Sequence, residues 1–384
     1  MPESAGIVLV TTSFPRGGDG SEAAGAFVAD LAEELAKTRR VRVVAPGAAA
    51  GIEIYRPGVE VFRFKAPDRP LSTLRPWIPG DLVALRAVMK AGAEVTRHAV
   101  RDGSPDRILA LWALPSGAWA RQAAREAGIP YSVWTLGSDI WSLGRLPGVR
   151  TWLRVIMRGA RRCYSDGLRL ADDSRRIAGR DVTFLPSTRR IDSRRTEAVR
   201  ASAPYRLLFL GRWHPNKGVD LMLEALAELS SEDWRRIEMV EICGGGPMES
   251  VVRDGVGRLL AAGRPVRLYG YLDKAAAEAA MLRADWLLIP SRIESIPVIF
   301  SDAMKLGLPV VSTPVGDLKA LVSESPACGR VAAAAQPQSF ALALSDALRN
   351  DASAFAKGVE NRARRFDLEQ IARRLLSETG VDGE

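Results

Sequence analysis

The segment Leu287–Val322 reads LLIPSRIESIPVIFSDAMKLGLPVVSTPVGDLKALV and decides the fold. The apolar run from Trp286 to Ile289 stops at a proline, which predicts a buried strand of a parallel sheet. A loop follows, then a helix from about Pro297, a residue suited to a first helical turn, and a second strand over Pro309–Ser312. A strand, a loop, a helix and a strand in this order predict an α/β protein with a doubly wound parallel sheet. Such sheets bind ligands at the carboxyl ends of their strands.

Two carboxylates stand out in this unit. Glu294 falls in the loop after the first strand, and Asp302 lies eight residues later, inside the helix. Ionised carboxylates accept several O–H bonds, which suits a polyhydroxylated ligand. The residues alone leave a second interpretation open, in which both side chains simply face solvent.

The segment resembles the donor-binding core of the retaining GT-B glycosyltransferases of the family 4 class (glycosyl transferases group 1), which carry a Glu-x7-Glu pair here. The pieces that carry the resemblance are Pro290-Ser291, Glu294-Ser295-Ile296-Pro297, Ala303-Met304, Gly307 to Val311 and Thr313 to Gly316. The second family glutamate is Asp302 in this chain, one methylene shorter.

The resemblance implies a nucleotide-sugar donor, UDP- or GDP-linked, bound between two Rossmann-like domains. Glu294 is then the catalytic carboxylate that contacts the donor sugar, and Asp302 contacts the ribose. The donor-binding residues implied at the start of the helix are Ser295, Ile296, Pro297 and Val298.

A candidate diphosphate site opens the C-terminal half. A strand over Arg206–Leu210 leads into Gly211-Arg212-Trp213-His214-Pro215-Asn216-Lys217-Gly218, and a helix follows. Arginine can bind two phosphate oxygens at once, lysine adds a mobile charge, and the helix N-terminus favours anions. A surface loop is the alternative. In the resembled family, Gly211, Arg212, Lys217 and Gly218 match the motif position by position.

Two further turns continue this half. Gly244-Gly245-Gly246-Pro247 matches the family's second glycine-rich turn, although by itself it is a tight turn between a strand and a helix. Tyr271 ends the next strand and is expected near the nucleotide base. The resemblance therefore adds Gly245 and Tyr271 to the donor site.

The N-terminal half alternates strands and helices in the same way. Gly6–Thr12 predicts a strand and Glu22–Lys37 a helix, with Gly25 in its first turn. A small residue there lets a phosphate approach the backbone N–H groups of a helix N-terminus. By resemblance, Gly25 approaches the donor diphosphate, and a plain loop is the alternative.

Candidate bases are scarce in this half. Leu111 and Leu136 stand at strand ends where the resembled family often has histidines, and the chain's two histidines, His98 and His214, suggest structural or exposed roles. Asp139 is the remaining candidate for a catalytic base at that sheet edge. A turn in which Asp139 caps the next segment is an equal alternative.

The formal charge of +9 is concentrated in one region. Residues 145–200 hold 15 arginines, no lysine and six acidic residues, so the rest of the chain is neutral overall. Val149–Tyr164 predicts a basic amphipathic helix, which can lie on an anionic bilayer. Its arginines are Arg150, Arg154, Arg158, Arg161 and Arg162. A solvated helix is the alternative, and nucleic acid is disfavoured because no binding motif accompanies the arginines.

Length and composition limit the architecture. A chain of 384 residues suggests two domains. No apolar run reaches the roughly 18 residues of a membrane span. No signal peptide is expected. Three widely spaced cysteines favour neither disulfides nor a metal site, so a cytoplasmic location is expected, peripheral to the inner membrane face if the basic helix binds lipid. We predict an N-terminal acceptor-side domain over 1–190, a linker over 191–204, a nucleotide-sugar domain over 205–360 and a returning C-terminal helix over 361–384.

The expected activity is metal-free transfer of a sugar to a glycan or lipid-linked acceptor, in polysaccharide or glycolipid biosynthesis. A catalytically degenerate partner protein and a GT-B sugar-nucleotide 2-epimerase remain alternatives, the first because of Leu111, Leu136 and Asp302. No Asp-x-Asp motif for a donor-bound metal is present. The sugar, the base, the acceptor and the linkage are not decided by the residues.

Overall fold

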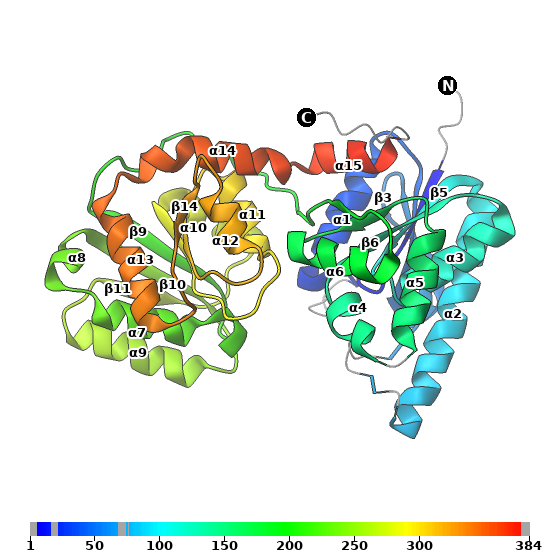
Figure 1. Cartoon of the computed structure of the whole chain (residues 1–384), viewed down its shortest axis with the longest axis horizontal. Coiled ribbons are helices and arrows are strands. Elements are labelled where there is room, and N and C mark those ends of the chain that lie inside the picture. The colour runs from blue at the N-terminus through cyan, green and yellow to red at the C-terminus, as the bar shows by residue number, and fades with distance from the viewer. Residues whose placement is uncertain (1–5, 17–21, 68–73, 76, 147, 378–384) are drawn as a thin grey trace. The chain divides into compact units, whose positions relative to one another are not determined.

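The computed structural model describes residues 6–16, 22–67, 74–75, 77–146 and 148–377 (Figure 1). The chain forms two compact units, one from residues 1–190 with 368–384 and one from residues 191–367. Each contains one parallel or largely parallel sheet with helices packed on it. The predicted fold class, two doubly wound α/β domains, is confirmed.

Unit 1, the N-terminal unit, is built around an eight-stranded sheet of order β3-β4-β2-β1-β5-β6-β7-β8, in which only β3 is antiparallel to its neighbour. Its elements are β1 (Gly6–Val10), α1 (Glu22–Ala36), β2 (Val41–Gly47), β3 (Gly51–Arg56), β4 (Val59–Lys65), α2 (Pro79–Gly103), β5 (Pro105–Leu111), α3 (Ser116–Ala127), β6 (Tyr131–Thr135), α4 (Ser138–Trp141), α5 (Val149–Gly159), β7 (Cys163–Ser165), α6 (Leu168–Ala178), β8 (Thr183–Phe184) and, from the end of the chain, α15 (Leu368–Leu376).

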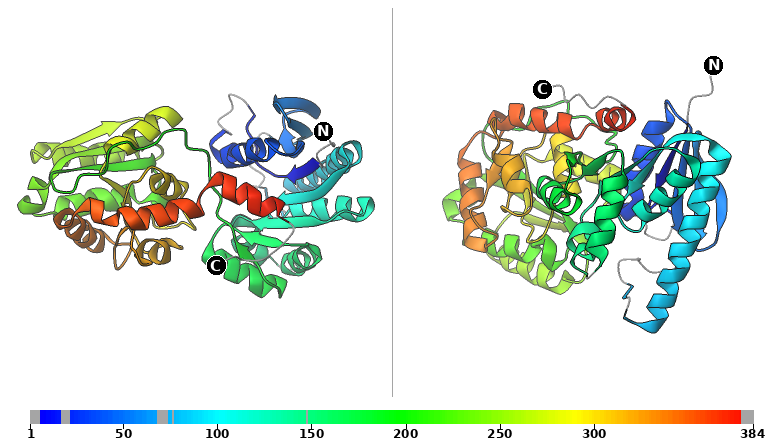
Figure 2. Two further views of the ribbon diagram at one scale, coloured as in Figure 1. Left: turned by 90° about the horizontal axis from the view of Figure 1, so that it is seen from above. Right: turned by 45° about the vertical axis from the view of Figure 1, so that its right-hand side comes forward.

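The central strands of unit 1 are apolar throughout because helices cover both faces of the sheet. Val8 and Val10 of β1 point into a core with α2, α3, α5 and α6, whereas Ile7 and Leu9 point into a core with α1 and α15. Figure 2 shows α15 beside α1, in agreement with their contacts. The last helix is thus part of the N-terminal core.

The sequence prediction for residues 149–164 is partly wrong. The helix α5 ends at Gly159, and Cys163 and Tyr164 belong to the buried strand β7. The edge strand β3 is also absent from the sequence prediction, because an exposed edge lacks the continuous apolar run of a buried strand.

Unit 2, the C-terminal unit, has a six-stranded parallel sheet of order β11-β10-β9-β12-β13-β14. Its elements are β9 (Tyr205–Arg212), a 3-10 turn (Pro215–Lys217), α7 (Val219–Glu228), α8 (Ser231–Arg235), β10 (Ile237–Gly245), α9 (Glu249–Ala261), β11 (Val266–Tyr269), α10 (Lys274–Arg283), β12 (Trp286–Ile289), α11 (Val298–Lys305), β13 (Val310–Ser312), α12 (Leu318–Ser323), β14 (Gly329–Val331), α13 (Pro337–Arg349) and α14 (Ala356–Arg365). The strands and the helix expected from the opening segment are present as β12, α11 and β13.

Residues 191–204 have no regular secondary structure but pack with unit 2. The Arg195 guanidinium donates to the carbonyls of Met281, Leu282, Ala284 and Leu306, at the carboxyl ends of α10 and α11. On the other side of the division, the Arg190 backbone N–H donates to Asp30 of unit 1 at 2.7 Å. The unit boundary at Arg190 and Ile191 therefore has almost no free linker.

Candidate functional site

The topology of unit 2 brings two loops together. From β9, the chain runs outward through β10 and β11 and then returns to form β12 on the opposite side of β9. The strand order therefore reverses between β9 and β12, and open α/β sheets bind ligands at such a point. The loops that follow these two strands are residues 213–218 and 290–297, which we call the lysine loop and the glutamate loop.

Direct hydrogen bonds hold these two loops together. The backbone N–H groups of Arg292 and Ile293 donate to the Asn216 carbonyl at 2.8 and 3.3 Å. The Arg292 guanidinium binds both oxygens of Asp220, at 2.7 and 2.9 Å, and also the Pro215 carbonyl at 3.0 Å. Although burial raises the pKa of Asp220, its bonds to Arg292 hold that pKa below the usual value.

The two side chains predicted to contact the donor meet across these loops. Lys217 Nζ forms an ion pair with Glu294 Oε1. The Lys217 side chain is 34% exposed and that of Glu294 is 16% exposed, so both can be reached from solvent. The structure thus joins the candidate diphosphate residue to the candidate sugar residue at one point.

Gly316 lets the glutamate loop pack closely against the backbone at residues 316–317. Gly316 has a φ of 53°, and a Cβ there would lie 2.2 Å from the Glu294 carbonyl oxygen. The next residue, Asp317, donates its backbone N–H to the Ser295 carbonyl at 3.0 Å. A side chain at position 316 would therefore displace the backbone that carries Glu294.

The second glycine-rich turn lies against the lysine loop. Gly244 has a φ of 151°, and a Cβ there would lie 1.9 Å from the Gly211 carbonyl oxygen. The Tyr271 hydroxyl donates to the Gly245 carbonyl at 2.6 Å, while the tyrosine side chain remains largely exposed. Gly211, Gly245 and Tyr271 are thus neighbours beside the candidate donor site.

The Arg212 side chain is exposed and, among the residues that the structure describes, has no hydrogen-bond or ion-pair partner. A guanidinium without a partner at the end of β9 is free to bind an anion. At the start of α11, Pro297 is the N-cap residue and Val298 is 42% exposed, while Ser295 and Ile296 are half-buried. The structure gives these four residues no contact with a donor, so their role stays a prediction.

Asp302 is fully buried in α11, and its Oδ1 lies 3.6 Å from Nζ of Lys305 on the same helix. It lies eight residues after Glu294, and its side chain is enclosed in the interior of unit 2. Its contact with a ribose stays a prediction.

Asp139 is wrong as a surface base. It is completely buried, and its oxygens accept backbone N–H bonds from Ala113 at 2.6 Å and from Leu136, Gly137 and Ile140 at 3.1–3.3 Å. Burial raises its pKa to about 6 even though these bonds lower it. The capping alternative is the correct one, since Asp139 ties the loop after β5 to the start of α4.

The loop that Asp139 holds contains an unusual backbone conformation. Trp112 has a φ of 71°, which is strained for a tryptophan. Its backbone N–H donates to the Trp134 carbonyl at 2.9 Å, and the next residue, Ala113, donates to Asp139. This loop follows β5, which lies beside β1 at the reversal point of the unit 1 sheet.

Gly25 has a packing role that the sequence does not reveal. A Cβ at this position would lie 2.7 Å from the Phe14 Cα and 2.8 Å from the Pro15 nitrogen. The glycine thus lets the loop after β1 lie directly on α1, and its approach to a donor diphosphate stays a prediction. Leu111 is fully buried and Leu136 is half-buried, so neither position offers a proton acceptor.

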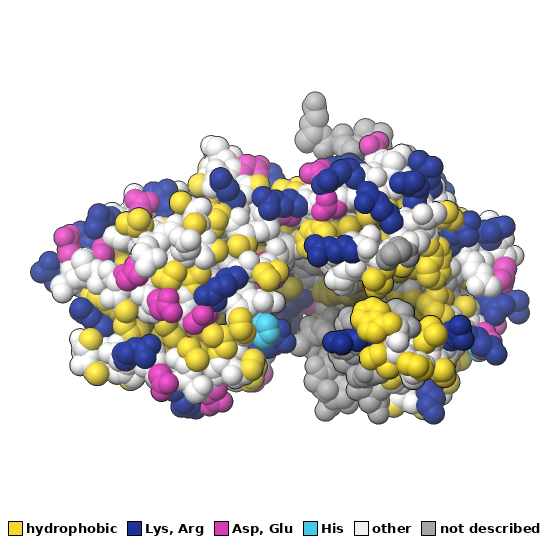
Figure 3. Space-filling view, turned by 60° about the horizontal axis from the view of Figure 1, so that its bottom comes forward, with side chains coloured by type: hydrophobic (Ala, Val, Ile, Leu, Met, Phe, Trp, Pro, Cys, Tyr) yellow, Lys and Arg dark blue, Asp and Glu magenta, His cyan; other side chains and the backbone are white. Residues whose placement is uncertain are grey.

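Two of the α5 arginines are engaged within unit 1. Arg154 Nε donates to the Ile177 carbonyl at 3.0 Å and Arg158 Nε to the Ala178 carbonyl at 2.9 Å, at the carboxyl end of α6. Arg150 and Arg161 are exposed without such partners among the described residues, whereas Arg162 is half-buried and engaged. On the face drawn in Figure 3, lysines and arginines are scattered over both units.

The remaining site expectations concern histidines, cysteines and membrane spans. His98 pairs with Asp102 at 2.7 Å on the surface of α2, and His214 Nδ1 accepts the Asn216 backbone N–H at 3.2 Å, so both are structural. The three cysteines are free and buried. None of the described helices has both the length and the apolar character that a bilayer crossing needs.

The sequence alone did not identify the residues that hold the two loops of the candidate site in place. Arg292 and Asp220 hold the lysine and glutamate loops, yet neither belongs to a recognised spacing. Gly316 falls within the segment that carries the family resemblance, but the sequence does not reveal that it supports the glutamate loop. The available signal was weak: an arginine between Pro290 and Glu294, and an acidic residue directly after Gly218-Val219.

Two family models cover most of the chain. Residues 22–186 match the glycosyl transferase 4-like domain, and residues 204–350 match the model described as glycosyl transferases group 1. Sucrose-phosphate synthase from Thermosynechococcus elongatus has the same fold, with a TM-score of 0.67, 17% identity and 97% of both chains covered. The chain has the GT-B fold, and each of its two units matches a glycosyl transferase domain model.

The relatives of this chain are named for different glycosyltransferase activities. It is 33% identical to D-inositol 3-phosphate glycosyltransferase of Kineococcus radiotolerans over 46% of its own length, which spans 43% of that protein. It is 25% identical to the putative teichuronic acid biosynthesis glycosyltransferase TuaC of Bacillus subtilis, over 75% of this chain and 70% of that protein. An Anabaena HepE structure in complex with UDP and glucose shares 18% identity, with a TM-score of 0.66 and 97% and 98% coverage.

Proposed function

We propose that this enzyme transfers a sugar from a nucleoside-diphosphate donor to an acceptor hydroxyl with retention of anomeric configuration, as family 4 class enzymes do. The observation that carries the proposal is the ion pair between Lys217 and Glu294 at the reversal point of the unit 2 sheet. A cation suited to phosphate and a carboxylate suited to sugar hydroxyls are adjacent there, as the two ends of a nucleotide sugar require.

In this proposal, Arg212 and Lys217 bind the diphosphate, and the N-terminus of α7 faces the same anion. Glu294 binds hydroxyls of the transferred sugar, exchanging part of its contact with Lys217 for the donor. The bond from the anomeric carbon to the diphosphate oxygen breaks as the bond to the acceptor oxygen forms. The departing phosphate oxygen takes the acceptor proton on the same face, so the buried Asp139 is not needed as a base.

Two cationic side chains supply the charge that a leaving diphosphate needs, which supports transfer without a metal. The described residues contain no group of three or more His, Cys, Asp and Glu side chains that could hold an ion. Metal independence itself is a proposal, and adding EDTA to the transfer assay tests it directly.

For the donor, UDP is the first candidate and GDP the second. The Anabaena neighbour is described with UDP and glucose, and another neighbour is described as trehalose-6-phosphate from E. coli bound with UDP-2-fluoro glucose. For the acceptor, the names of the curated relatives favour a glycan or a phosphorylated, polyhydroxylated small molecule, and a lipid-linked glycan fits the basic surface of α5. The proposed setting is polysaccharide or glycolipid synthesis at the cytoplasmic face of the membrane.

The test is a panel of UDP- and GDP-sugars incubated with the enzyme and a bacterial glycan and lipid extract, with products identified by mass spectrometry and anomeric configuration by NMR. We expect release of the nucleoside diphosphate and a product that keeps the donor's configuration. A product of inverted configuration would refute retention. A free 2-epimerised sugar nucleotide would identify an epimerase, and binding without any turnover would identify a degenerate protein.

A further inference from the structure

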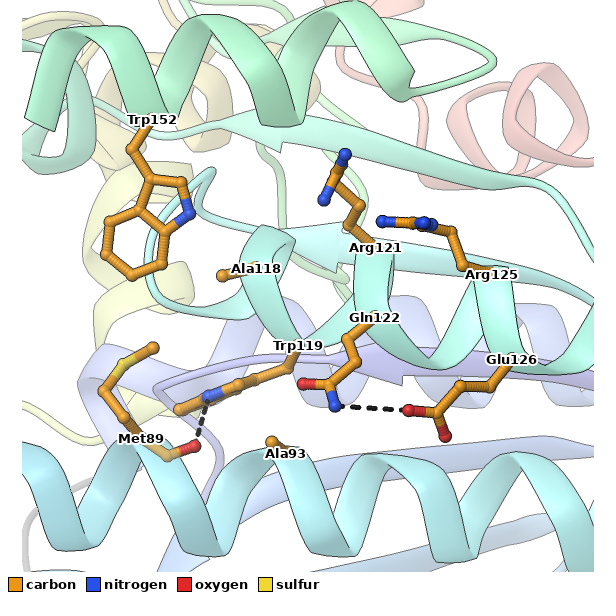
Figure 4. Close-up of a pocket in the computed structure, with 9 residues that line it drawn as sticks. All are labelled: Met89, Ala93, Ala118, Trp119, Arg121, Gln122, Arg125, Glu126 and Trp152. Atoms are coloured by element: carbon orange, nitrogen blue, oxygen red, sulfur yellow. Dashed lines mark hydrogen bonds between the residues drawn. The ribbon is translucent and has the colours of Figure 1, made fainter.

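A cavity of about 590 Å³ lies on the outer surface of unit 1, among α2, α3 and α5. It is lined only by residues of these three helices, and none of them belongs to the lysine or glutamate loop of unit 2. Its size falls within the range of small-molecule sites. Figure 4 shows the side chains that line it.

One part of the cavity is apolar. Met89 and Ala93 of α2, Ala118 of α3 and Trp152 of α5 contribute to it. The indole of Trp152 extends from α5 toward the other two helices and is 45% exposed, which is unusual for so large an apolar side chain (Figure 4). The buried Trp119 forms part of the wall and donates its indole N–H to the Met89 carbonyl at 3.0 Å.

The other part of the cavity is cationic. Arg121 and Arg125 extend from α3 toward the side of α5, whereas Gln122 and Glu126 extend toward α2 (Figure 4). The nearest carboxylate on α3 is already engaged, because Glu126 accepts from Gln122 at 3.2 Å and lies 4.0 Å from the Arg97 guanidinium. Arg125 is exposed and has no ion-pair partner among the described residues.

We propose that this cavity binds a phosphorylated amphiphile, with the phosphate on Arg121 and Arg125 and the alkyl chain against Trp152 and Met89. Guanidinium groups bind phosphate oxygens in pairs, and the arrangement places such groups directly beside an apolar surface. A purely apolar ligand would leave Arg125 without a partner, and a purely ionic ligand would leave the indole in water. The site does not depend on the proposed transfer activity, because its occupancy is measured by binding alone.

Calorimetry with octyl phosphate, kept below its micellar concentration, tests this proposal. Each buried methylene contributes about fourfold in affinity, so burial of roughly three to four of the eight carbons should make octyl phosphate bind about 100-fold more tightly than inorganic phosphate. Octyl glucoside has the same chain without the charge and should bind at least tenfold more weakly than octyl phosphate. Equal affinities for octyl phosphate and inorganic phosphate would overturn the proposal, as would equal affinities for the two octyl compounds.

Variants locate the binding in the cavity. Arg125→Gln and Trp152→Ser remove exposed side chains, and each should weaken octyl phosphate binding about tenfold, while Ala118→Leu should block it sterically. Arg101→Gln is the matched control, an exposed arginine of unit 1 outside the cavity, and should bind like the wild type. Circular dichroism checks folding, and unchanged binding in both Arg125→Gln and Trp152→Ser would refute the site.

Discussion

Arg292 and Asp220 form a two-pronged ion pair, with N–O distances of 2.7 and 2.9 Å, between the glutamate loop and the first turn of α7. Neither residue is predicted to touch the donor. The pair instead sets the distance between the loop that carries Lys217 and the loop that carries Glu294. We therefore regard both residues as positioning residues of the candidate donor site.

The first prediction follows from that pair. Arg292→Lys keeps the positive charge but loses the planar fork, so the two loops should be held less firmly. A loss of about 1 kcal/mol corresponds to about fivefold weaker UDP binding in calorimetry. Arg253→Lys is the control, because its partner Glu249 lies on the exposed surface of α9. Equal affinities in wild type and Arg292→Lys would contradict the positioning role.

Removal of Arg212 should weaken nucleoside-diphosphate binding without affecting the fold. A charge-assisted bond contributes about 1.5–3 kcal/mol, so Arg212→Ala should bind UDP at least tenfold more weakly. Its melting temperature should not change, since the side chain is exposed and makes no intramolecular bond among the described residues. Arg235→Ala, an exposed arginine of the same unit on α8, is the control. Unaltered affinity in a folded Arg212→Ala variant would exclude Arg212 from the donor site.

The two carboxylates of the opening segment should respond differently to substitution. Glu294→Gln keeps the shape but weakens contacts to the sugar near the reacting carbon, so turnover should fall more than donor affinity. Asp302→Asn should mainly lower stability, by about 1–3 kcal/mol in urea unfolding, because it breaks a buried pair with Lys305. Asp302→Glu should also destabilise, since a larger side chain at a fully buried position strains the packing around it. Full turnover in Glu294→Gln would show that the donor binds elsewhere.

Asp139 should make stability depend on pH in an identifiable direction. Its folded-state pKa of about 6 lies above the ordinary value of 3.8. The protonated form is therefore favoured in the folded state, and this contribution is complete below pH 4 and lost as pH rises through 6. Relative to Asp139→Asn, the wild type should lose about 1–3 kcal/mol of unfolding free energy between pH 4 and pH 7. Urea unfolding of both proteins across this range measures the difference, and a constant difference would contradict the raised pKa.

The arginines of α5 and of the segment just after it should separate into two classes. Arg150→Gln with Arg161→Gln removes exposed charges and should reduce sedimentation with anionic vesicles, in a manner that salt also reduces, without changing stability. Arg154→Gln with Arg158→Gln removes donors to the α6 carbonyls and should lower the melting temperature. Equal binding of the wild type to neutral and anionic vesicles would argue against a membrane role for this helix.

Much of the fold could be predicted because the central strands are buried on both faces. Strands such as Trp286–Ile289 and Gly6–Val10 read as unbroken apolar runs, and proline and glycine mark where they stop. Short or edge strands carry no such signal. Cys163 and Tyr164 are predicted in a helix because the preceding arginines continue a helical spacing, although both belong to β7. The glycine and lysine of the lysine loop were recognisable because a phosphate site needs those residue types in that order.

The sequence by itself determined the α/β class, the two units and the residue types of the donor site, since all of these depend on local pattern. Only the tertiary structure decided which carboxylates are accessible. Glu294 and Asp302 are separated by a fixed number of residues, but the direction of α11 leaves the first at the surface and buries the second. Asp139 lies in a turn that could hold a catalytic base, yet it is buried, and the Ala113 backbone N–H of the loop after β5, distant in sequence, donates to it. Burial and long-range hydrogen bonds arise from the packing of segments far apart in the chain, and a local pattern does not contain them.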